Sequence, residues 1–439
     1  MLENNKSKTE NIFEEICSSS NLEKSFAAAF KNKGSAGVDG VTVEMFKANL
    51  ANELTRLQKE LHGWSYSPQP VRRVEIPKPD GSKRKLGIPC VRDRVVQGAI
   101  KAIIEPIFDP EFSENSYGFR PKKGQQQAIA AAQKIVDSGK EYVVDIDLEK
   151  FFDRVNHDRL IFRLGQKLSD KRVLRLIGLI LRSGVMEDGL VKASPEGTTQ
   201  GSPLSPLLSN IVLDELDKEI EKRGIEFVRF ADDCNLFVKS QAAAERVMES
   251  IKGFIEKKLK LKVNEKKSKV AKSKYVKFLG MTILRGSRAI AQASMKRMMT
   301  KVKDLIPRGT NKNLEQTIKT INVWYTGWSN YFQMTNYPSQ LRVVESHIRR
   351  RLRARIVCQQ KKPRYLRAKL MAMGISRKLA CTTAYSNVGP WALSHKHGIE
   401  RAFPNRWFKA QGLQTSSDKE LPHWRNTNVW IKLTEEPCT

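Results

Sequence analysis

The sequence predicts an α+β fold, because strand-forming segments that carry carboxylates alternate with long stretches of helical periodicity. Residues 225–229 and 234–238 are short runs rich in aromatic and branched side chains, and Asp232 and Asp233 lie between them. This pattern predicts a β-hairpin with adjacent carboxylates at its tip. Such charges repel one another and are costly to bury unless a cation lies between them. The alternative is an ordinary Asp-rich turn.

A second strand is predicted at residues 142–147, where alternation places Asp145 and Asp147 on one face. The chain becomes helical after this strand, and a helical block separates it from the predicted hairpin. Strand, helices and then hairpin is an α+β order in which carboxylates from different strands can converge on one sheet surface.

The chain carries a formal net charge of +31 over 439 residues. A charge of this size indicates a polyanionic partner, either nucleic acid or an anionic membrane surface. No apolar run is long enough to span a bilayer, and the first residues lack the apolar core of a signal peptide. We therefore expect nucleic acid as the partner, no membrane and a cytoplasmic location. The six cysteines form no Cys-x-x-Cys pair, which argues against a disulfide framework and a zinc finger.

Residues 71–89 predict a second hairpin, with Pro79-Asp80-Gly81 as its turn. It concentrates six cations on a small element: Arg72, Arg73, Lys78, Lys83, Arg84 and Lys85. One interpretation is a solvated face or a protected sheet edge. The functional interpretation is a clamp on a triphosphate or a phosphodiester backbone.

A loop of small residues at 197–206 precedes a predicted helix that ends at Gly224. Small residues let a backbone or a base approach closely, although the loop could equally be a tight connection.

Basic helices are predicted beyond residue 290. An apolar stripe from Leu314 to Phe332 indicates core packing. The segment 341–370 holds eleven Lys or Arg against a single Glu, which favours a phosphate track over a merely solvated face. Its arginines assigned to nucleic acid are Arg349, Arg350, Arg351, Arg353 and Arg355.

Carboxylates on strands, a basic hairpin, a small-residue loop and a basic helical tail together form the set that two-metal nucleotidyl transfer needs. Mg²⁺ prefers oxygen ligands and shares its coordination shell with substrate phosphates.

These segments resemble the motifs of the group II intron reverse transcriptases, or maturases, over nearly the whole chain. Phe230-Ala231-Asp232-Asp233 resembles the family's Tyr-Ala-Asp-Asp hairpin, and residues 145–153 resemble its first carboxylate motif. Further matching segments are 32–40 at the N-terminal extension, 75–79, 86–89 and 116–121 in the fingers, 197–206 under the templating base pair, 278–280 in the palm and 327–332 in the thumb.

The resemblance implies a role for individual residues. The metal ligands it implies are Asp147, the backbone carbonyl of Leu148, Asp232 and Asp233. The dNTP-binding residues it implies are Arg72, Lys78, Arg84, Gln200 and Phe152, the last as a block to a ribose 2′-hydroxyl. The template or primer residues it implies are Lys33, Gly34, Gly37, Arg120, Phe230 and Trp328. The cofactor it implies is a pair of Mg²⁺ ions, with Mn²⁺ as a substitute.

The sequence departs from the family pattern in the hairpin and in the small-residue loop. Phe230 replaces Tyr and loses its hydroxyl, while Thr199 and Ser202 replace Pro and Gly. Because every metal ligand is present, we expect activity to survive. The HNH endonuclease found at the end of some members is not recognisable here.

The resemblance implies a right-hand polymerase. We expect an N-terminal extension, fingers and palm over residues 1–285, an α-helical thumb or maturase X domain over 286–365, and a basic DNA-binding region over 366–439. The function implied is RNA-directed DNA polymerase activity of a group II intron, with help in splicing and retrohoming. The expected partners are intron RNA, a template–primer duplex, target DNA and dNTPs, in a bacterial cytoplasm close to the nucleoid or in a ribonucleoprotein.

Two alternatives stay open at this point. One is an intron-independent reverse transcriptase of DNA repair or phage defence, and the other is an RNA-binding maturase that no longer polymerises. The sequence does not predict an oligomeric state.

Overall fold

The chain folds into two compact units. The computed structural model describes residues 11–77, 81, 83–187, 190–192, 196–310 and 312–416. One unit is formed by Met1–Ile135 with Lys140–Ala271, and the other by Val136–Gly139 with Lys272–Thr439.

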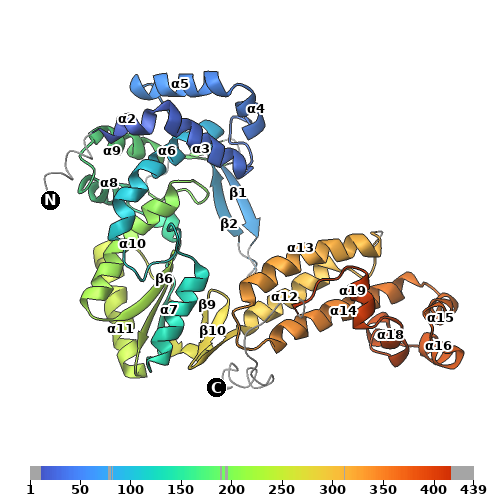
Figure 1. The fold of residues 1–439 in the computed structure, drawn as a ribbon. Coiled ribbons are helices and arrows are strands. Elements are labelled where there is room, and N and C mark those ends of the chain that lie inside the picture. The colour runs from blue at the N-terminus through green and yellow to red at the C-terminus, as the bar shows by residue number, and fades with distance from the viewer. Residues whose placement is uncertain are drawn as a thin grey trace. The chain divides into compact units, whose positions relative to one another are not determined.

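Helices make up most of the first unit. Their bounds are α2 (Ile12–Cys17), α3 (Ser19–Lys31), α4 (Val43–Ala48), α5 (Leu50–His62), α6 (Val91–Phe108), α7 (Gln125–Asp137), α8 (His157–Gly165), α9 (Lys171–Leu181), α10 (Ser205–Lys222) and α11 (Gln241–Phe254). Helix α6 is central, because it packs against α2 and α3 and buries Val95, Val96 and Ile100 completely. In Figure 1, α2 to α5 gather at one end of this unit, and α7 and α11 lie at the other end beside β6.

The predicted basic hairpin is confirmed as β1 (Val71–Pro77) and β2 (Lys83–Ile88), which pair antiparallel. They belong to a sheet of order β2-β1-β4-β5, with β4 at Val185–Glu187 and β5 at Leu190–Lys192. Strand β4 pairs parallel to β1 through Val71 and Val185. Pro79 and Asp80 of the predicted turn lie outside the described residues, as do Lys78 and Ser82 on either side of the turn.

The two predicted carboxylate-bearing segments are confirmed as parts of one sheet, of order β6-β7-β3-β8. Its strands are β3 (Tyr142–Ile146), β6 (Glu226–Phe230), β7 (Asp233–Val238) and β8 (Lys269–Lys272). Strand β7 pairs antiparallel with both β6 and β3, and α11 packs against β3 and β7. Consecutive side chains of these strands are buried, among them Val144, Phe227 and Leu236, so both faces of the sheet are covered.

The second unit begins with a small sheet of order β11-β10-β9, whose strands are β9 (Lys277–Phe278), β10 (Met281–Leu284) and β11 (Ser287–Ile290). Its helices are α12 (Gln292–Leu305), α13 (Leu314–Phe332), α14 (Ser339–Gln359), α15 (Pro363–Ala372), α16 (Arg377–Ala384), α17 (Pro390–Leu393), α18 (His397–Ala402) and α19 (Asn405–Ala410). The stripe predicted on α13 is confirmed as core, because Ile318, Ile321 and Tyr325 are buried. Among the described helices, none has the length and hydropathy needed to cross a membrane.

Candidate active site

Two of the predicted carboxylates lie at the same end of one sheet. Asp147 follows the last residue of β3, and Asp232 stands between β6 and β7. The pairing of Ile146 with Cys234 brings these ends together. Burial raises the pKa of Asp232 above its ordinary value, and the negative charge of Asp147 raises it further. The two carboxylates are therefore close enough to repel, which is the condition in which a cation is stabilising.

The tip of the hairpin has an unusual backbone. Ala231 is buried and has a φ of 59°, in the left-handed region that costs a side-chain-bearing residue energy. The Arg229 guanidinium donates a hydrogen bond of 2.8 Å to the Ala231 carbonyl. This bond offsets part of that cost and fixes the peptide that precedes Asp232.

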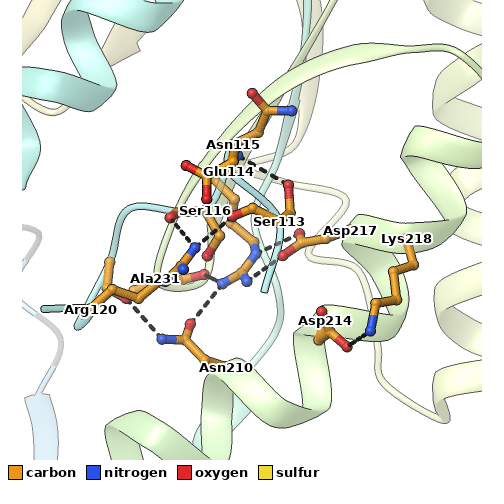
Figure 2. A network of polar contacts seen from close by, with 12 residues as sticks. Ser113, Glu114, Asn115, Ser116, Arg120, Asn210, Asp214, Asp217, Lys218 and Ala231 are labelled. Carbon is orange, nitrogen blue, oxygen red and sulfur yellow. Dashed lines mark hydrogen bonds and ion pairs between the residues drawn. The ribbon is translucent and has the colours of Figure 1, made fainter. Parts of the chain in front are cut away.

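Arg229 is itself held from α10. Its Nε and Nη2 donate to the two carboxylate oxygens of Asp217 at 2.7 and 2.5 Å, and its Nη1 donates to Asn210 at 3.1 Å. The residues that accept these hydrogen bonds, Asp217, Asn210 and Ala231, are labelled in Figure 2. The arrangement ties the hairpin tip to one helix by a bidentate ion pair.

The loop at residues 115–120 packs on the other side of the hairpin. Arg229 donates its backbone N–H to the Asn115 carbonyl, and its own carbonyl accepts from Tyr117, both at 2.9 Å. Asn210 donates to the Gly118 carbonyl at 2.9 Å. A Cβ on Gly118 would lie only 2.1 Å from the backbone nitrogen of Ala231, so the close approach requires glycine.

Replacing Asp217 by Asn is expected to destabilise the first unit by about 3–5 kcal/mol, because it leaves the Arg229 charge buried without a counter-charge. Both side chains of the pair are fully buried. Urea unfolding measures the change in the free energy of unfolding, and hydrogen exchange at β6 and β7 measures the change at the hairpin itself. The matched control is Lys218→Ala, which breaks a half-exposed pair with Asp214 and should cost about 1 kcal/mol or less. Equal effects of the two substitutions would contradict the structural role given to Arg229.

The small-residue loop is bound to the segment that carries Phe152. Thr198 donates its N–H to the Phe152 carbonyl at 2.6 Å, and Gly197 donates to Val155 at 2.8 Å. The Gly197 carbonyl lies 2.6 Å from Nε2 of the buried His157. Gly197 has a φ of 95°, a conformation that glycine adopts without strain. These bonds fix the backbone of Phe152, whose ring packs edge-on against Phe151 at 5.2 Å.

The same loop also contacts the basic hairpin. Gly87 donates its N–H to the Gln200 carbonyl at 2.8 Å, and a Cβ on Gly87 would meet the Thr199 methyl group at 2.2 Å. The Ser202 hydroxyl donates to Gln97 at 2.7 Å. Thr199 and Ser202, the two departures from the family pattern in this loop, thus have specific contacts in this chain.

We predict that Phe152→Ala will raise ribonucleotide incorporation relative to deoxynucleotides by about 10–200-fold, the range that one missing apolar contact controls. The reason is that the loop fixes the Phe152 backbone, so the alanine substitution removes the ring that is expected to block a ribose 2′-hydroxyl. Single-nucleotide extension with paired dNTP and rNTP measures the ratio. Phe162→Ala is the control, because that ring is 68% exposed on α8. Unchanged discrimination would remove Phe152 from this role.

The predicted nucleotide-binding cations differ in their placement. Arg84 is exposed on β2, and its positive charge opposes the rise in the pKa of Asp232. Arg72 is half-buried, and its Nε and Nη2 donate to the Ala36 carbonyl at 3.1 and 2.8 Å. Lys78 lies outside the described residues. Of these residues, the structure therefore brings Arg84 to the carboxylates.

The predicted N-terminal template loop is bound to the start of α6. A Cβ on Gly37 would lie 2.6 Å from the Cα of Cys90, and one on Gly34 would lie 2.4 Å from the Arg94 guanidinium. The contact at Gly37 involves backbone atoms and therefore requires glycine, whereas a Cβ on Gly34 would meet only the end of the Arg94 side chain. Lys33 is exposed, with a left-handed φ of 47°.

Arg120 and Trp328 have structural contacts of their own. The Arg120 guanidinium is buried, and it donates to the Asp109 carboxylate at 2.7 Å and to the carbonyls of Ser113 and Ser116. In Figure 2 it lies in the loop beside these serines. Trp328 packs in the second unit against Phe332, with ring centroids 4.8 Å apart. Phe230 is half-buried, at the end of β6.

The expectation of an exposed phosphate track on α14 requires correction for three of its five arginines. Arg351, Arg353 and Arg355 are buried, with exposed fractions of 8, 9 and 0%. Their guanidinium groups donate to backbone carbonyls at Ile306, Phe403 and Lys312, respectively. These side chains point inward because they donate hydrogen bonds to carbonyls at the ends of neighbouring helices and in a connecting segment, where the helical hydrogen-bond pattern leaves carbonyls without a partner. Arg349 and Arg350 are half-buried, and Arg350 lies 3.8 Å over the Trp391 ring.

Sequence reasoning missed the residues that hold the carboxylates in place. Arg229 and Asp217 could have been suspected, since each is a charged residue with apolar neighbours in a segment predicted to be buried. Asn264 donates its side-chain amide to the Asp147 carboxylate at 3.0 Å. No local pattern indicates this contact, because Asn264 lies in a basic segment with the composition of a loop.

The donor set suits a hard divalent cation. Within the described ranges, no group of three or more His, Cys, Asp or Glu side chains gathers closely enough to hold a metal alone. A site with two neighbouring carboxylates is instead the kind that Mg²⁺ completes with substrate phosphates. Leu148 lies opposite Val263 in a β-bridge, whose two hydrogen bonds are made by the Asp147 carbonyl and the Glu149 N–H. The Leu148 carbonyl, a proposed metal donor, takes no part in this bridge. Asp233 is exposed. Burial raises the pKa of the neighbouring Cys234 thiol, and the charges of Asp217, Asp145 and Asp233 add to this effect.

Neighbouring carboxylates at the end of the sheet formed by β6, β7 and β3, with a cationic hairpin beside them, define the palm and fingers of a nucleic-acid polymerase. Residues 76–283 match the family model "Reverse transcriptase (RNA-dependent DNA polymerase)". Residues 295–374 match the model "Group II intron, maturase-specific domain". The chain belongs to the group II intron family of reverse transcriptases and maturases, which are RNA-directed DNA polymerases.

Two relatives show how much of the chain is shared. Protein YkfC of Escherichia coli (strain K12) is 36% identical over 278 residues, which are 55% of this chain and 73% of YkfC. The group II intron-encoded protein LtrA of Lactococcus lactis subsp. cremoris is 28% identical over 320 residues, which are 58% of this chain and 53% of LtrA. The chain thus spans about half the length of LtrA. The family and the right-hand polymerase class expected from the sequence are confirmed.

Proposed function

We propose that this chain extends a DNA primer on an RNA template, with Asp147, Asp232 and Asp233 as the ligands of two Mg²⁺ ions. The observation that carries the proposal is the proximity of Asp147 to the partly buried Asp232, whose pKa is raised by burial and by its neighbour's charge. Reverse transcriptases depend on divalent metal ions, and oxygen ligands favour Mg²⁺, with Mn²⁺ as its substitute. The Leu148 carbonyl adds an oxygen donor.

The chemistry supplied by these ions, when bound, is activation of the primer 3′-hydroxyl and stabilisation of the leaving pyrophosphate. The chain's own cations bind the triphosphate: Arg84, whose charge acts on Asp232, and Arg72 of the same hairpin. Lys78, which lies outside the described residues, is proposed from the family resemblance. The Phe152 ring excludes a ribose 2′-hydroxyl, and Gln200 lies in the loop against the incoming nucleotide.

Nucleic-acid binding is proposed for surfaces in both units. Template and primer contacts are assigned to Lys33, Gly34, Gly37, Phe230 and Trp328, whereas the buried Arg120 holds its own loop and is no longer assigned to nucleic acid. In the segment 341–370, the exposed cations Lys361, Lys362 and Arg364 are better placed for phosphate than the buried arginines of α14. The partners are intron RNA, whose splicing and retrohoming the chain assists, and target DNA, in a bacterial cytoplasm.

Extension of a DNA primer on an RNA template, with dNTPs and Mg²⁺, tests the polymerase function. We expect extension that stops on chelation and returns with Mg²⁺ or Mn²⁺. Affinity for the duplex should fall by about a thousandfold between 50 and 200 mM salt, since each neutralised phosphate releases counterions. Splicing of the RNA that flanks the gene, assayed with and without the protein, tests the maturase role. Absence of extension would contradict the proposal, and extension without splicing support would point to the intron-independent alternative.

A further inference from the structure

A turn that follows α11 forms hydrogen bonds with both the backbone and the side chain of Asp147. Its residues 264–268 run from Asn264 to Ser268, between the end of the helical segment and β8. The Asn264 backbone N–H donates to the Asp147 carbonyl at 2.8 Å, and the Asp147 N–H donates to the Ser268 hydroxyl at 3.0 Å. These contacts fix the backbone of Asp147. The side-chain amide of Asn264 adds a different contact, a 3.0 Å hydrogen bond to Oδ1 of the Asp147 carboxylate.

We propose that Asn264 is a positioning residue that orients the Asp147 carboxylate for metal binding. The inference rests on the proposed polymerase function. A carboxylate at the end of a strand can rotate about its side-chain torsions, and the bond to Oδ1 selects one orientation while leaving Oδ2 to face a ligand. The amide donor is neutral, so it orients the carboxylate oxygen without repelling the metal ion. A positively charged donor would instead compete with the metal ion for the carboxylate. Residues that hold a metal ligand in this way commonly control metal affinity about 10–100-fold.

The alternative is that the turn has a purely structural role and only holds β8 beside β3. The backbone bonds and Ser268 can do this without the Asn264 side chain. A purely structural role therefore predicts loss of stability from Ser268→Ala and little change from removing the Asn264 amide. A positioning role predicts that the loss follows the amide and appears in metal affinity.

The test is Mn²⁺ binding to the full chain, measured by electron paramagnetic resonance titration without nucleotide. We expect Asn264→Ala to weaken Mn²⁺ binding by about tenfold. Asn264→Leu, which fills the space without a donor, should do the same. In primer extension, both variants should need correspondingly more Mg²⁺ for half-maximal rate, with KM for dNTP and duplex affinity within about twofold of the unsubstituted chain. Glu265→Ala is the matched control, because its exposed side chain in the same turn pairs only with Lys252 among the described contacts.

Mn²⁺ affinity unchanged in folded Asn264 variants would overturn the inference. Unfolding of both variants would also overturn it, because Asn264 would then be a structural residue. The proposed function fails in a different way, when the unsubstituted chain shows no metal-dependent extension.

Discussion

Asp232→Asn is expected to abolish primer extension while leaving the fold at least as stable as before. Burial and the charge of Asp147 both raise the pKa of Asp232, so its ionised form is less favourable in the folded chain than in the unfolded chain. A neutral side chain of the same shape removes that cost. It also removes a proposed metal ligand, and several kcal/mol of transition-state stabilisation are expected to be lost with it. A loss of about 4 kcal/mol corresponds to a rate lower by about a thousandfold.

Steady-state extension and the midpoint of thermal unfolding should therefore change in opposite senses. This opposition is the usual trade-off at a site that holds like charges for function. Asp145→Asn provides the control, because Asp145 lies on β3 two residues before Asp147, and the sequence pattern alone could not choose between these two carboxylates. We expect Asp145→Asn to retain extension within a few-fold. Retained extension by Asp232→Asn, or a comparable loss from Asp145→Asn, would contradict the assignment of the metal ligands.

The parts of the fold that were predictable are those with a local period. Alternation of apolar side chains predicted β3 and the hairpin of β6 and β7, and the stripe on α13 predicted its buried face. The pattern placed Asp145 and Asp147 on one face of the first segment and Asp232 and Asp233 at the hairpin tip, and only the family resemblance selected Asp147 over Asp145. Their approach to one another could only be expected, since it depends on the pairing of β3 with β7, which joins segments far apart in the sequence.

The direction of a long cationic side chain was not predictable, because distant groups decide it. The arginine run of α14 has the composition of a solvated face, yet Arg351 donates to the Ile306 carbonyl beyond the end of α12. Arg355 reaches Lys312 in the following segment. A sequence pattern gives the charge of such residues, but it does not predict which backbone carbonyls will accept their hydrogen bonds. The same reason hid Arg229 and Asn264, whose partners lie on other elements.

Gly118→Ala is expected to inactivate the enzyme from a position that bears no side chain. The added Cβ would lie 2.1 Å from the nitrogen and 2.8 Å from the Cα of Ala231, and 2.9 Å from the carbonyl carbon of Phe230. All three are backbone atoms, so the overlap cannot be relieved by a rotamer change, and the tip carrying Asp232 must move.

The hairpin tip has little freedom to accommodate such a shift. Ala231 is already in the left-handed region, and Arg229 holds its carbonyl from a buried pair with Asp217. A displacement of about 1 Å at reacting groups can cost about a hundredfold in rate. We therefore expect kcat to fall by at least that factor and the free energy of unfolding to fall by about 1–3 kcal/mol.

The matched substitution for Gly118→Ala is Gly124→Ala, farther along the same connection. A Cβ there meets only the Gln127 side chain, at an ordinary 3.7 Å, so it should leave kcat unchanged and should stabilise the chain slightly through the unfolded state. Extension kinetics and urea unfolding of the two variants separate backbone overlap from a general intolerance of alanine in this segment. Equal activity of both variants would show that the hairpin tip can move without loss, and that the left-handed Ala231 is not required to present Asp232. A loss confined to Gly118→Ala would instead place the loop at residues 115–120 among the elements that set the geometry of the carboxylates.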